Sequence, residues 1–444
     1  MTAKNGIISP HLTSPHLTSP HLTSPNSCAY SFLITGANFG NKGAQSMLFV
    51  TTNELRRRFP SSTIYFATSD KYPEEEYIFR KIHITPRTEK IVAGGFCGVV
   101  ALMNQAARDV VKFVIRRPNA TFGHYFDLAS VIHKLTAIID ISGFAFSSKW
   151  GMGSCEHYIK RIQLAEKYGI PIYLMPQSFG PFDFPDEVID EIKPVFSRVL
   201  RYPRIIFARE KEGFDCMTKL FGLTQVKLSA DLVLQNRETD PAEIFTAQHE
   251  ITVPKIESAR ELAGIVPNMR CFDHGDKDKI LADYREIIAF ILGKGYKVVL
   301  FRHSREDIEA CRMLKNFYPN DENVVLVENE FSCFEYNEFV KQFKFLVCSR
   351  YHGLVHAGKN GIPCIYLGWA VKYHSLAEIL GQSRYVFDIT SGSTDSAEII
   401  DALSHLLENY DDECRTIAER LAGIQAHNCF DIVEEDMIKS GVVK

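Results

Sequence analysis

Short apolar runs alternate with helix-length amphipathic segments along most of this chain. Runs such as Ile205–Ala208 and Phe345–Cys348 have the length of a buried strand, and each is followed by polar residues and then by apolar positions at helical spacing. Strand, helix, strand order with tight connections is typical of parallel βαβ units. Further strands are predicted at residues 30–34, 62–67, 136–142, 172–175, 262–266, 297–301, 324–327 and 364–367. The pattern therefore predicts an α/β protein with parallel sheets.

A chain of 444 residues is long for one hydrophobic core, so we expect two domains. The polar, irregular stretch 237–255 is the predicted linker. We place the first domain at 28–240 and the second at 256–425, and we expect a C-terminal tail at 426–444. A Ser-Pro-His-Leu-Thr repeat fills much of residues 1–27. Proline at a five-residue period opposes both helix and sheet, so this segment is predicted to be a disordered, low-complexity tail.

Composition limits the classes of partner. The formal net charge is −4 and no basic block stands out, which argues against nucleic acid. The 11 cysteines are scattered without CxxC pairs, as buried thiols are in a reducing cytosol. No run of 18 apolar residues predicts a membrane span. An apolar segment at 91–117 ends in basic residues, which either complement a helix dipole or rest on anionic lipid. We therefore expect a cytoplasmic protein, with peripheral contact at the inner face of the membrane as an open alternative.

The most informative stretch is 344–380, where two successive strand ends carry cations. Ser349, Arg350 and His352 follow the first strand, and Lys372 follows the second. Open α/β sheets bind their ligands at the carboxyl ends of strands. Two cations and a titratable imidazole suit an anionic substrate and a proton transfer. The alternative is that Arg350 only pairs with a surface acid and that His352 only caps a helix.

This stretch also resembles the signature of the polysaccharide pyruvyl transferase family. The similar features are Ser-Arg-x-His-Gly at 349–353, Gly-Ile-Pro at 361–363, an apolar strand, a lysine and a closing Leu-Gly. Weaker likenesses occur upstream, in the Gly-Asn-x-Gly turn within 35–44 and in Pro-Gln-Ser-x-Gly-Pro at 176–181. The resemblance implies two Rossmann-like domains facing a central cleft, as in GT-B glycosyltransferases. It also implies formation of a ketal on a sugar from phosphoenolpyruvate.

The strand-end positions and the resemblance together give the candidate site. Arg350 and His352 are the expected catalytic residues. The resemblance makes Arg209 a ligand of phosphoenolpyruvate and gives Asp231 a family-like position, although a structural cap explains Asp231 equally well. The expected substrate-binding residues are Asn38, Asn41, Lys42, Gln177, Ser178, Arg209, Asp231, Arg302, His303, Ser349 and Lys372. For the turn that holds Asn38, Asn41 and Lys42, a plain glycine-permitted turn is the competing interpretation.

Two patterns typical of metal sites were weighed and set aside. Asp276-Lys277-Asp278 has the DxD form, but it precedes a helix without a strand before it, so an N-terminal charge pair that stabilises the helix dipole explains it better. His352 and His356 stand four residues apart on a predicted helix, but no third ligand follows nearby. We therefore expect no metal.

The sequence favours an enzyme that transfers a pyruvyl group from phosphoenolpyruvate to two hydroxyls of one sugar, giving a cyclic ketal in exopolysaccharide or cell-surface glycan biosynthesis. The donor's carboxylate and phosphate call for arginines, and protonation of its enol carbon calls for an acid such as His352. No cofactor is expected, and the acceptor is a sugar or a lipid-linked oligosaccharide. The alternatives are a GT-B-type glycosyltransferase or sugar-nucleotide enzyme, and a non-catalytic carbohydrate-binding protein. The oligomeric state is left open.

Overall fold

The computed structural model describes residues 30–72, 74–83 and 128–444. The N-terminal repeat and the apolar segment 91–117 lie outside these residues, so the expectations of disorder and of lipid contact stay predictions. No helix among the described residues is both long enough and apolar enough to cross a membrane.

The first domain is built on a parallel sheet with the strand order β3-β2-β1-β4-β5-β6-β7. Its strands, in the described part of the chain, are β1 (Ser31–Thr35), β2 (Thr63–Thr68), β3 (Arg80–His83), β4 (Ala137–Asp140), β5 (Ile172–Gln177), β6 (Ile205–Ala208) and β7 (Val226–Leu228). Ile34 pairs with Phe66 on one side and with Ile139 on the other. The strand β1 therefore lies in the middle of the sheet, with β2 and β3 added on one side of it and β4 to β7 on the other. Open α/β sheets bind ligands at the carboxyl ends of the strands beside such a reversal of strand order, here between β1 and β4.

The second domain repeats this plan with the order β10-β9-β8-β11-β12-β13. Its strands are β8 (Leu262–Val266), β9 (Lys297–Phe301), β10 (Val324–Val327), β11 (Phe345–Cys348), β12 (Cys364–Leu367) and β13 (Val386–Phe387). All pairings are parallel. The expectation of two parallel-sheet, Rossmann-like domains is confirmed.

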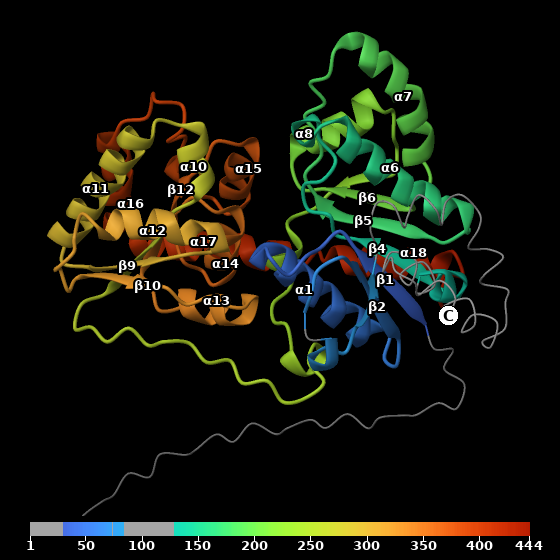
Figure 1. Ribbon diagram of the computed structural model, residues 1–444, viewed down its shortest axis with the longest axis horizontal. Coiled ribbons are helices and arrows are strands. Elements are labelled where there is room, and N and C mark those ends of the chain that lie inside the picture. Colours follow the sequence, from blue (N-terminus) through green and yellow to red (C-terminus); the bar gives the residue numbers. More distant parts are fainter. Residues whose placement is uncertain (1–29, 73, 84–127) are drawn as a thin grey trace, which may run out of the picture.

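Helices cover the two sheets (Figure 1). They are α1 (Lys42–Arg58), α6 (Met152–Lys167), α7 (Asp186–Leu200), α8 (Lys211–Asp215), α9 (Leu232–Gln235), α10 (Met269–His274), α11 (Lys277–Gly293), α12 (Ile308–Lys315), α13 (Cys333–Val340), α14 (Tyr351–Lys359), α15 (Val371–Ile379), α16 (Ser396–Glu408), α17 (Tyr410–Gln425) and α18 (Cys429–Lys439). Asp276 caps α11 by accepting hydrogen bonds from the amides of Asp278 and Lys279, so the acids of the DxD pattern lie at a helix N-terminus as expected. Ser304 and Asp307 form a capping box directly before α12.

Two connections join the domains. Residues 246–261 contain no helix or strand and run from the first domain to β8, as the yellow-green chain directly below the two domains in Figure 1. At the other end the chain returns. The segment 426–444, expected as a tail, forms α18, which lies against the first domain. Asp436 accepts hydrogen bonds from Tyr173 Oη at 2.7 Å and from Arg204 at 3.0 Å. The apolar residues Phe430, Val433 and Met437 of α18 recur at helical spacing and are buried, which is why the segment folds.

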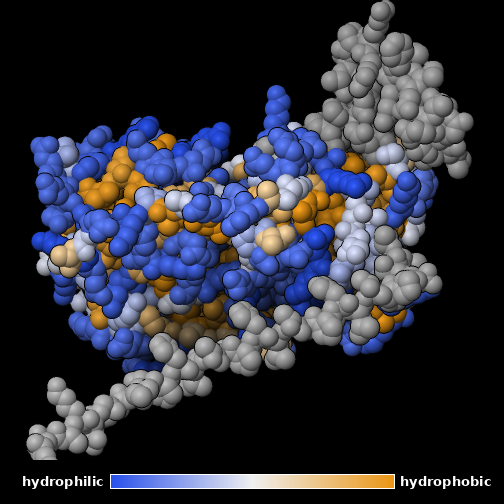
Figure 2. Space-filling view, turned by 90° about the horizontal axis from the view of Figure 1, so that it is seen from below, coloured by the Kyte–Doolittle hydropathy of each residue, from blue (hydrophilic) through white to orange (hydrophobic). Residues whose placement is uncertain are grey.

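One apolar core runs through the junction of the two domains. It includes residues of α1 and α9 from the first domain together with residues of α13 and α14 from the second. Phe49 of α1 stacks on Phe334 of α13, with ring centroids 5.4 Å apart. The outer face in Figure 2 is mainly hydrophilic, with apolar residues showing in smaller groups between polar ones. The domains are therefore docked through buried apolar contacts, and their strand ends are held near each other.

Candidate active site

The strand ends of both sheets contribute to one cluster of side chains. Arg209, directly after β6, lies over the ring of Tyr351 at the start of α14, 4.8 Å from its centroid. His352, the next residue, places Nε2 3.7 Å from Oδ2 of Asp231 in the first domain. Lys372, in the first turn of α15, places Nζ 5.5 Å from the ring of Phe144, which follows β4. Three pairs of residues therefore join the domains at the carboxyl ends of their strands.

Arg209 is held rigidly within the first domain. It is buried, and its Nη1 donates to Oδ2 of Asp231 at 2.7 Å. Its Nη2 donates to Oγ of Ser178 at 2.7 Å and to the carbonyl of Gly143 at 3.2 Å. Its Nε is buried and has no hydrogen-bond partner among the described residues, although Oε1 of Glu210 lies 3.8 Å from it. An orphaned donor on a buried guanidinium costs free energy, and an anionic ligand at this position would satisfy it.

Ser178 and Asp231 support Arg209. Ser178 Oγ donates to Glu210 at 2.8 Å, so the hydroxyl both accepts and donates in one short chain. Asp231 also caps α9 by accepting from the amide of Val233 at 2.9 Å. The capping alternative for Asp231 is thus present together with its contact to Arg209. Both residues lie in the cluster, and both orient the guanidinium.

His352 is packed against the start of α1. A Cβ on Gly43 would lie 2.0 Å from Nδ1 of His352, so only glycine permits this approach. Burial lowers the pKa of His352 to about 4, and the nearby carboxylate of Asp231 offsets this only in part. Its Nε2 has no hydrogen-bond partner among the described residues. The imidazole is therefore neutral at pH 7, and one ring nitrogen remains available to a ligand.

Lys372 is the least compensated cation of the cluster. Burial, and next the charge of Arg209, lower the pKa of Lys372 to about 8. Its Nζ lies above three rings, 5.4 Å from Tyr351, 5.5 Å from Phe144 and 5.7 Å from Tyr373. In the part of the chain that the structure describes, no carboxylate lies within ion-pair distance of it. An ammonium group that is crowded by another cation and lacks a counter-ion is typical of an anion-binding site.

Arg350 was expected to bind the anionic substrate, but its guanidinium is already paired with acidic residues of its own domain. Its Nε donates to Oδ2 of Asp307 at 2.8 Å, and its Nη2 donates to Oδ1 of Asp307 at 2.5 Å and to Glu306 at 2.8 Å. Asp307 is fully buried. The guanidinium therefore fixes the β11 turn against the capping box before α12, and only Nη1 is left without a hydrogen bond to the described residues. The pairing considered as the alternative for Arg350 is present, although the acid is buried.

Two expected substrate-binding residues lie beneath the site. Ser349 is fully buried, shares a hydrogen bond with Oη of Tyr284 at 2.9 Å, and its carbonyl accepts from Asn268 at 3.0 Å. Gln177 is also fully buried and donates to Asp140 at 3.3 Å and to the carbonyl of Met175 at 3.1 Å. These contacts orient the two strand ends. Neither side chain is presented to a ligand, because their polar atoms are satisfied inside the protein.

A second group of expected residues surrounds the start of α1. Asn41 caps α1 by accepting from the amides of Gly43 at 2.9 Å and Ala44 at 3.3 Å. Asn38 accepts from the amide of Asn41 at 2.9 Å, so both amide oxygens are used within the turn. Lys42 lies 3.8 Å from Glu330 of the second domain. Desolvation lowers the pKa of Lys42, and Glu330 opposes this. The turn is therefore a capped turn that borders the domain junction, and the substrate-binding role expected for it stays a prediction.

Arg302 and His303 lie differently with respect to the cluster around His352. Arg302 donates to the carbonyls of Glu328 at 3.1 Å and Asn329 at 3.2 Å, which fixes a loop of its own domain. His303 is buried, its Nε2 has no partner among the described residues, and its ring lies 6.4 Å from that of His352. Burial and then the neighbouring His352 lower the pKa of His303 well below its ordinary value. Thus His303 adjoins the cluster, whereas Arg302 supports it from outside.

The structure adds three residues that the sequence did not mark as site residues: Tyr351, Phe144 and Glu210. Tyr351 and Phe144 supply the rings beneath Arg209 and Lys372, and Glu210 anchors Ser178. Each directly adjoins a marked residue in the sequence or follows a predicted strand, which is the only signal that could have found them. Their roles come from contacts across the fold.

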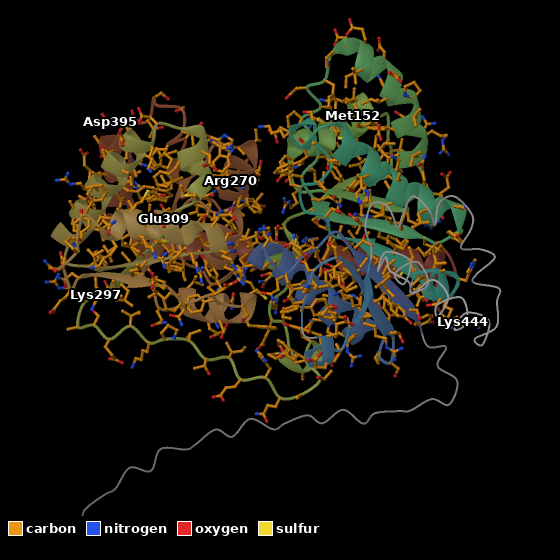
Figure 3. The ribbon with its side chains drawn as sticks, viewed as in Figure 1. Met152, Arg270, Lys297, Glu309, Asp395 and Lys444 are labelled. Carbon is orange, nitrogen blue, oxygen red and sulfur yellow. The ribbon has the colours of Figure 1, made fainter. Side chains whose placement is uncertain are left out.

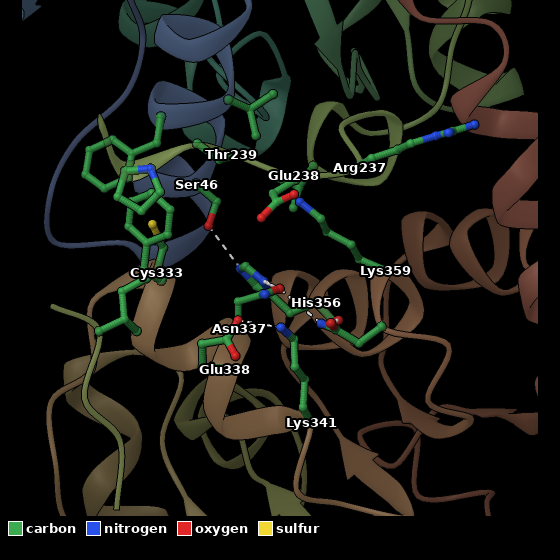
Figure 4. A pocket seen from close by; sticks show the side chains of 17 residues that line it. Ser46, Arg237, Glu238, Thr239, Cys333, Asn337, Glu338, Lys341, His356 and Lys359 are labelled. Atoms are coloured by element: carbon green, nitrogen blue, oxygen red, sulfur yellow. Dashed lines mark hydrogen bonds and ion pairs between the residues drawn. The ribbon is translucent and has the colours of Figure 1, made fainter. Parts of the chain in front are cut away.

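A separate cavity of about 370 Å³ lies on another side of the junction, between α1, α9, α13 and α14 (Figure 4). His356 lines it and contacts Oγ of Ser46 at 2.9 Å and Oδ1 of Asn337 at 3.2 Å. Burial lowers the pKa of Lys359, another lining residue, to about 8. No group of three metal-binding side chains occurs among the described residues.

Solved structures share this architecture. The UDP-GlcNAc 2-epimerase of Neisseria meningitidis, bound to UDP-GlcNAc, superposes with a TM-score of 0.55 at 12% identity, over 92% of this chain and 100% of that chain. A putative UDP-N-acetylglucosamine 2-epimerase of Listeria monocytogenes gives 0.53 at 10% identity, over 88% and 91%. At such identities the likeness shows the fold alone, and it confirms the GT-B-like arrangement. No curated protein sequence matches the chain significantly.

The sequence itself carries a more specific match. A family model described as polysaccharide pyruvyl transferase matches residues 41–370, which include α1 of the first domain and the β11 and β12 strand ends of the second. The matched residues contain Arg209, Asp231, Arg350 and His352. With this match over most of its length, the chain belongs to the polysaccharide pyruvyl transferase family.

Proposed function

We propose that this protein transfers the pyruvyl group of phosphoenolpyruvate to two hydroxyls of one sugar and releases phosphate. The observation that carries the proposal is the pairing of Lys372 with Arg209. Lys372 is half-buried and has no carboxylate within ion-pair distance among the described residues, the buried Arg209 has an Nε without a hydrogen bond, and a neutral imidazole lies beside them. Phosphoenolpyruvate presents a carboxylate and a phosphate close together, which two such cations would neutralise.

The donor anion would also prepare His352 for proton transfer. An anion bound next to the imidazole stabilises its charged form and raises its pKa from about 4. The proton is then delivered to the methylene carbon of the donor, and the carbon that bears the phosphate becomes electrophilic. The first sugar hydroxyl attacks this carbon, and the C–O bond to phosphate breaks. The second hydroxyl closes the ketal, and the hydroxyl protons leave with phosphate and the restored imidazole.

The cellular setting follows from this chemistry. Phosphoenolpyruvate is a cytoplasmic metabolite, so the proposed site of action is the cytoplasm, on a free or lipid-linked glycan destined for an exopolysaccharide or the cell surface. The reaction needs no redox or metal cofactor, because protonation and electrostatic stabilisation suffice for it.

The proposal is tested by phosphate release from phosphoenolpyruvate with galactose-, glucose- and mannose-type glycosides as acceptors. A sugar product carrying a pyruvate ketal, identified by mass and by its methyl resonance, is expected from one class. A matched reaction replaces phosphoenolpyruvate with a UDP-sugar. Turnover of the UDP-sugar without any use of phosphoenolpyruvate would contradict the proposal and would indicate a sugar-nucleotide enzyme on the same fold.

A further inference from the structure

The chain has two tryptophans, Trp150 in the first domain and Trp369 in the second. Trp150 closes a short helical turn, Ser148–Trp150, directly before α6 of the first domain. Trp369 precedes α15 of the second domain, and its ring lies 5.6 Å from that of His274 in α10. In Figure 3, Met152 at the start of α6 and Arg270 in α10 lie on the sides of the two domains that face each other.

Trp150 is connected to the anion cluster by a short path. Its ring lies 5.8 Å from that of Phe144 in an edge-to-face arrangement, and Phe144 lies 5.5 Å from Nζ of Lys372. The charge of Lys149, next to Trp150, acts on the pKa of Lys372 as well. Trp150 thus borders the site at which the donor is proposed to bind.

The exposure of Trp150 is unusual. With 58% of its surface accessible, it is the most exposed large apolar side chain among the described residues. Val371, across the junction and next to Lys372, is 51% exposed. Single exposed apolar residues are ordinary, but an exposed indole on a second ring next to a charged site points to a ligand. Phe144 fixes the indole and lowers the entropy lost on binding.

We propose that Trp150, seated on Phe144, is the platform that binds the sugar ring of the acceptor. This inference rests on the proposed function, since it supplies the second substrate of that reaction. One face of a pyranose ring carries C–H groups that pack on an aromatic surface, while its hydroxyls project from the edge. A ring seated on Trp150 is next to Phe144 and Lys372, so its edge hydroxyls are directed at the donor. The platform selects rings with an uninterrupted C–H face.

The kinetic test separates the two substrates. Trp150→Ala is expected to raise KM for the acceptor glycoside about ten-fold, the effect of losing one aromatic contact, with KM for phosphoenolpyruvate unchanged. Trp150→Phe should restore most of the acceptor affinity, because it keeps a flat ring. The matched control is Phe317→Ala, which removes another exposed ring, 42% accessible, just after α12. An unchanged acceptor KM in Trp150→Ala overturns the proposal.

A binding test works without turnover. In the Trp369→Phe protein, Trp150 is the single tryptophan, so its emission reports this position alone. Titration with methyl glycosides of galactose, glucose and mannose should change the emission saturably for one class, and titration with phosphoenolpyruvate alone should not. Turnover with no sugar-dependent emission change leaves the pyruvyl transfer standing and removes the platform. A sugar response without any use of phosphoenolpyruvate keeps the platform and removes the transfer. If there is neither a sugar-dependent change in emission nor any use of phosphoenolpyruvate, both the platform and the pyruvyl transfer are overturned.

Discussion

The guanidinium of Arg209 in the first domain lies 4.8 Å from the centroid of the Tyr351 ring in the second. The phenol ring therefore stabilises a cation that also donates hydrogen bonds to Asp231 and Ser178. Because the two residues belong to different domains, this contact couples the docking of the domains to the position of the proposed anion ligand. A cation–π contact of this kind contributes about 2 kcal/mol when it is desolvated.

Replacement of the ring should separate packing from polarity. Tyr351→Leu is expected to lower the free energy of unfolding by about 2 kcal/mol and to weaken phosphoenolpyruvate binding, because Arg209 loses its aromatic neighbour. Tyr351→Phe keeps the ring and should retain most of both. Urea denaturation and donor titration measure the two effects. Equal losses in the Leu and Phe variants would mean that the hydroxyl matters and the ring does not.

His352 is predicted to be the general acid. His352→Gln can hydrogen-bond but cannot supply a proton, so turnover should fall by about two to four orders of magnitude. Since the pKa of His352 is about 4 in the unliganded protein and rises with the donor, binding at pH 6–7 should take up a proton. Calorimetry in buffers of different ionisation enthalpy measures this uptake, which the Gln variant should lose.

The competing account of His352 is that it only binds phosphate or caps α14. A Gln variant that keeps most of the wild-type turnover, with only its donor affinity changed, would establish that account. Proton uptake that persists in the Gln variant would locate the titrating group elsewhere in the site.

The ammonium group of Lys372 should give donor binding a dependence on pH. Its pKa of about 8 in the free protein means that it is charged at pH 7 and loses its proton as the pH rises through 8. Phosphoenolpyruvate affinity is therefore expected to fall above pH 8, by up to about ten-fold per unit. Lys372→Arg, which stays charged, should flatten this profile. An unchanged profile in the Arg variant would remove Lys372 from anion binding.

Arg350 is predicted to have two roles that a pair of variants can separate. Arg350→Ala leaves the buried carboxylate of Asp307 without its partner, so we expect a loss of about 3–5 kcal/mol in the free energy of unfolding. If Nη1 also binds the donor, the free energy of phosphoenolpyruvate binding should in addition weaken by about 1.5–3 kcal/mol. The double variant Arg350→Met with Asp307→Asn removes the orphaned charge and should regain stability. Donor affinity that recovers with stability would assign Arg350 to structure alone.

The returning helix α18 should be essential to the first domain. Removing residues 429–444 takes away Phe430, Val433 and Met437, and burial of each such side chain contributes about 1.5–3 kcal/mol. We expect a melting temperature lower by many degrees, or no folded protein. The matched control removes residues 1–27, whose proline repeat is predicted to add nothing to the core. A control that lowers the melting temperature by several degrees would show that the N-terminal segment is docked.

The sequence by itself determined the fold class and the positions of most strands. Apolar runs such as Ile205–Ala208 and Phe345–Cys348 are local signals, and the turns after them are identified as soon as the strands are. Arg350, His352 and Lys372 were found in this way, whereas the role expected for Arg209 came from the family resemblance. The short edge strands β3 and β13 were missed, because pairing with a neighbour, more than their own composition, makes them strands.

Only the tertiary structure decided what each strand end does. Arg350 is bound by Asp307 from another βα turn, Ser349 and Gln177 are buried beneath the site, and His352 fits against Gly43 of the other domain. The return of α18 to the first domain also depends on partners far away in sequence. These contacts form between residues that no local period relates. They depend on how two separately patterned domains dock, and that docking is set by the packing of their complementary surfaces.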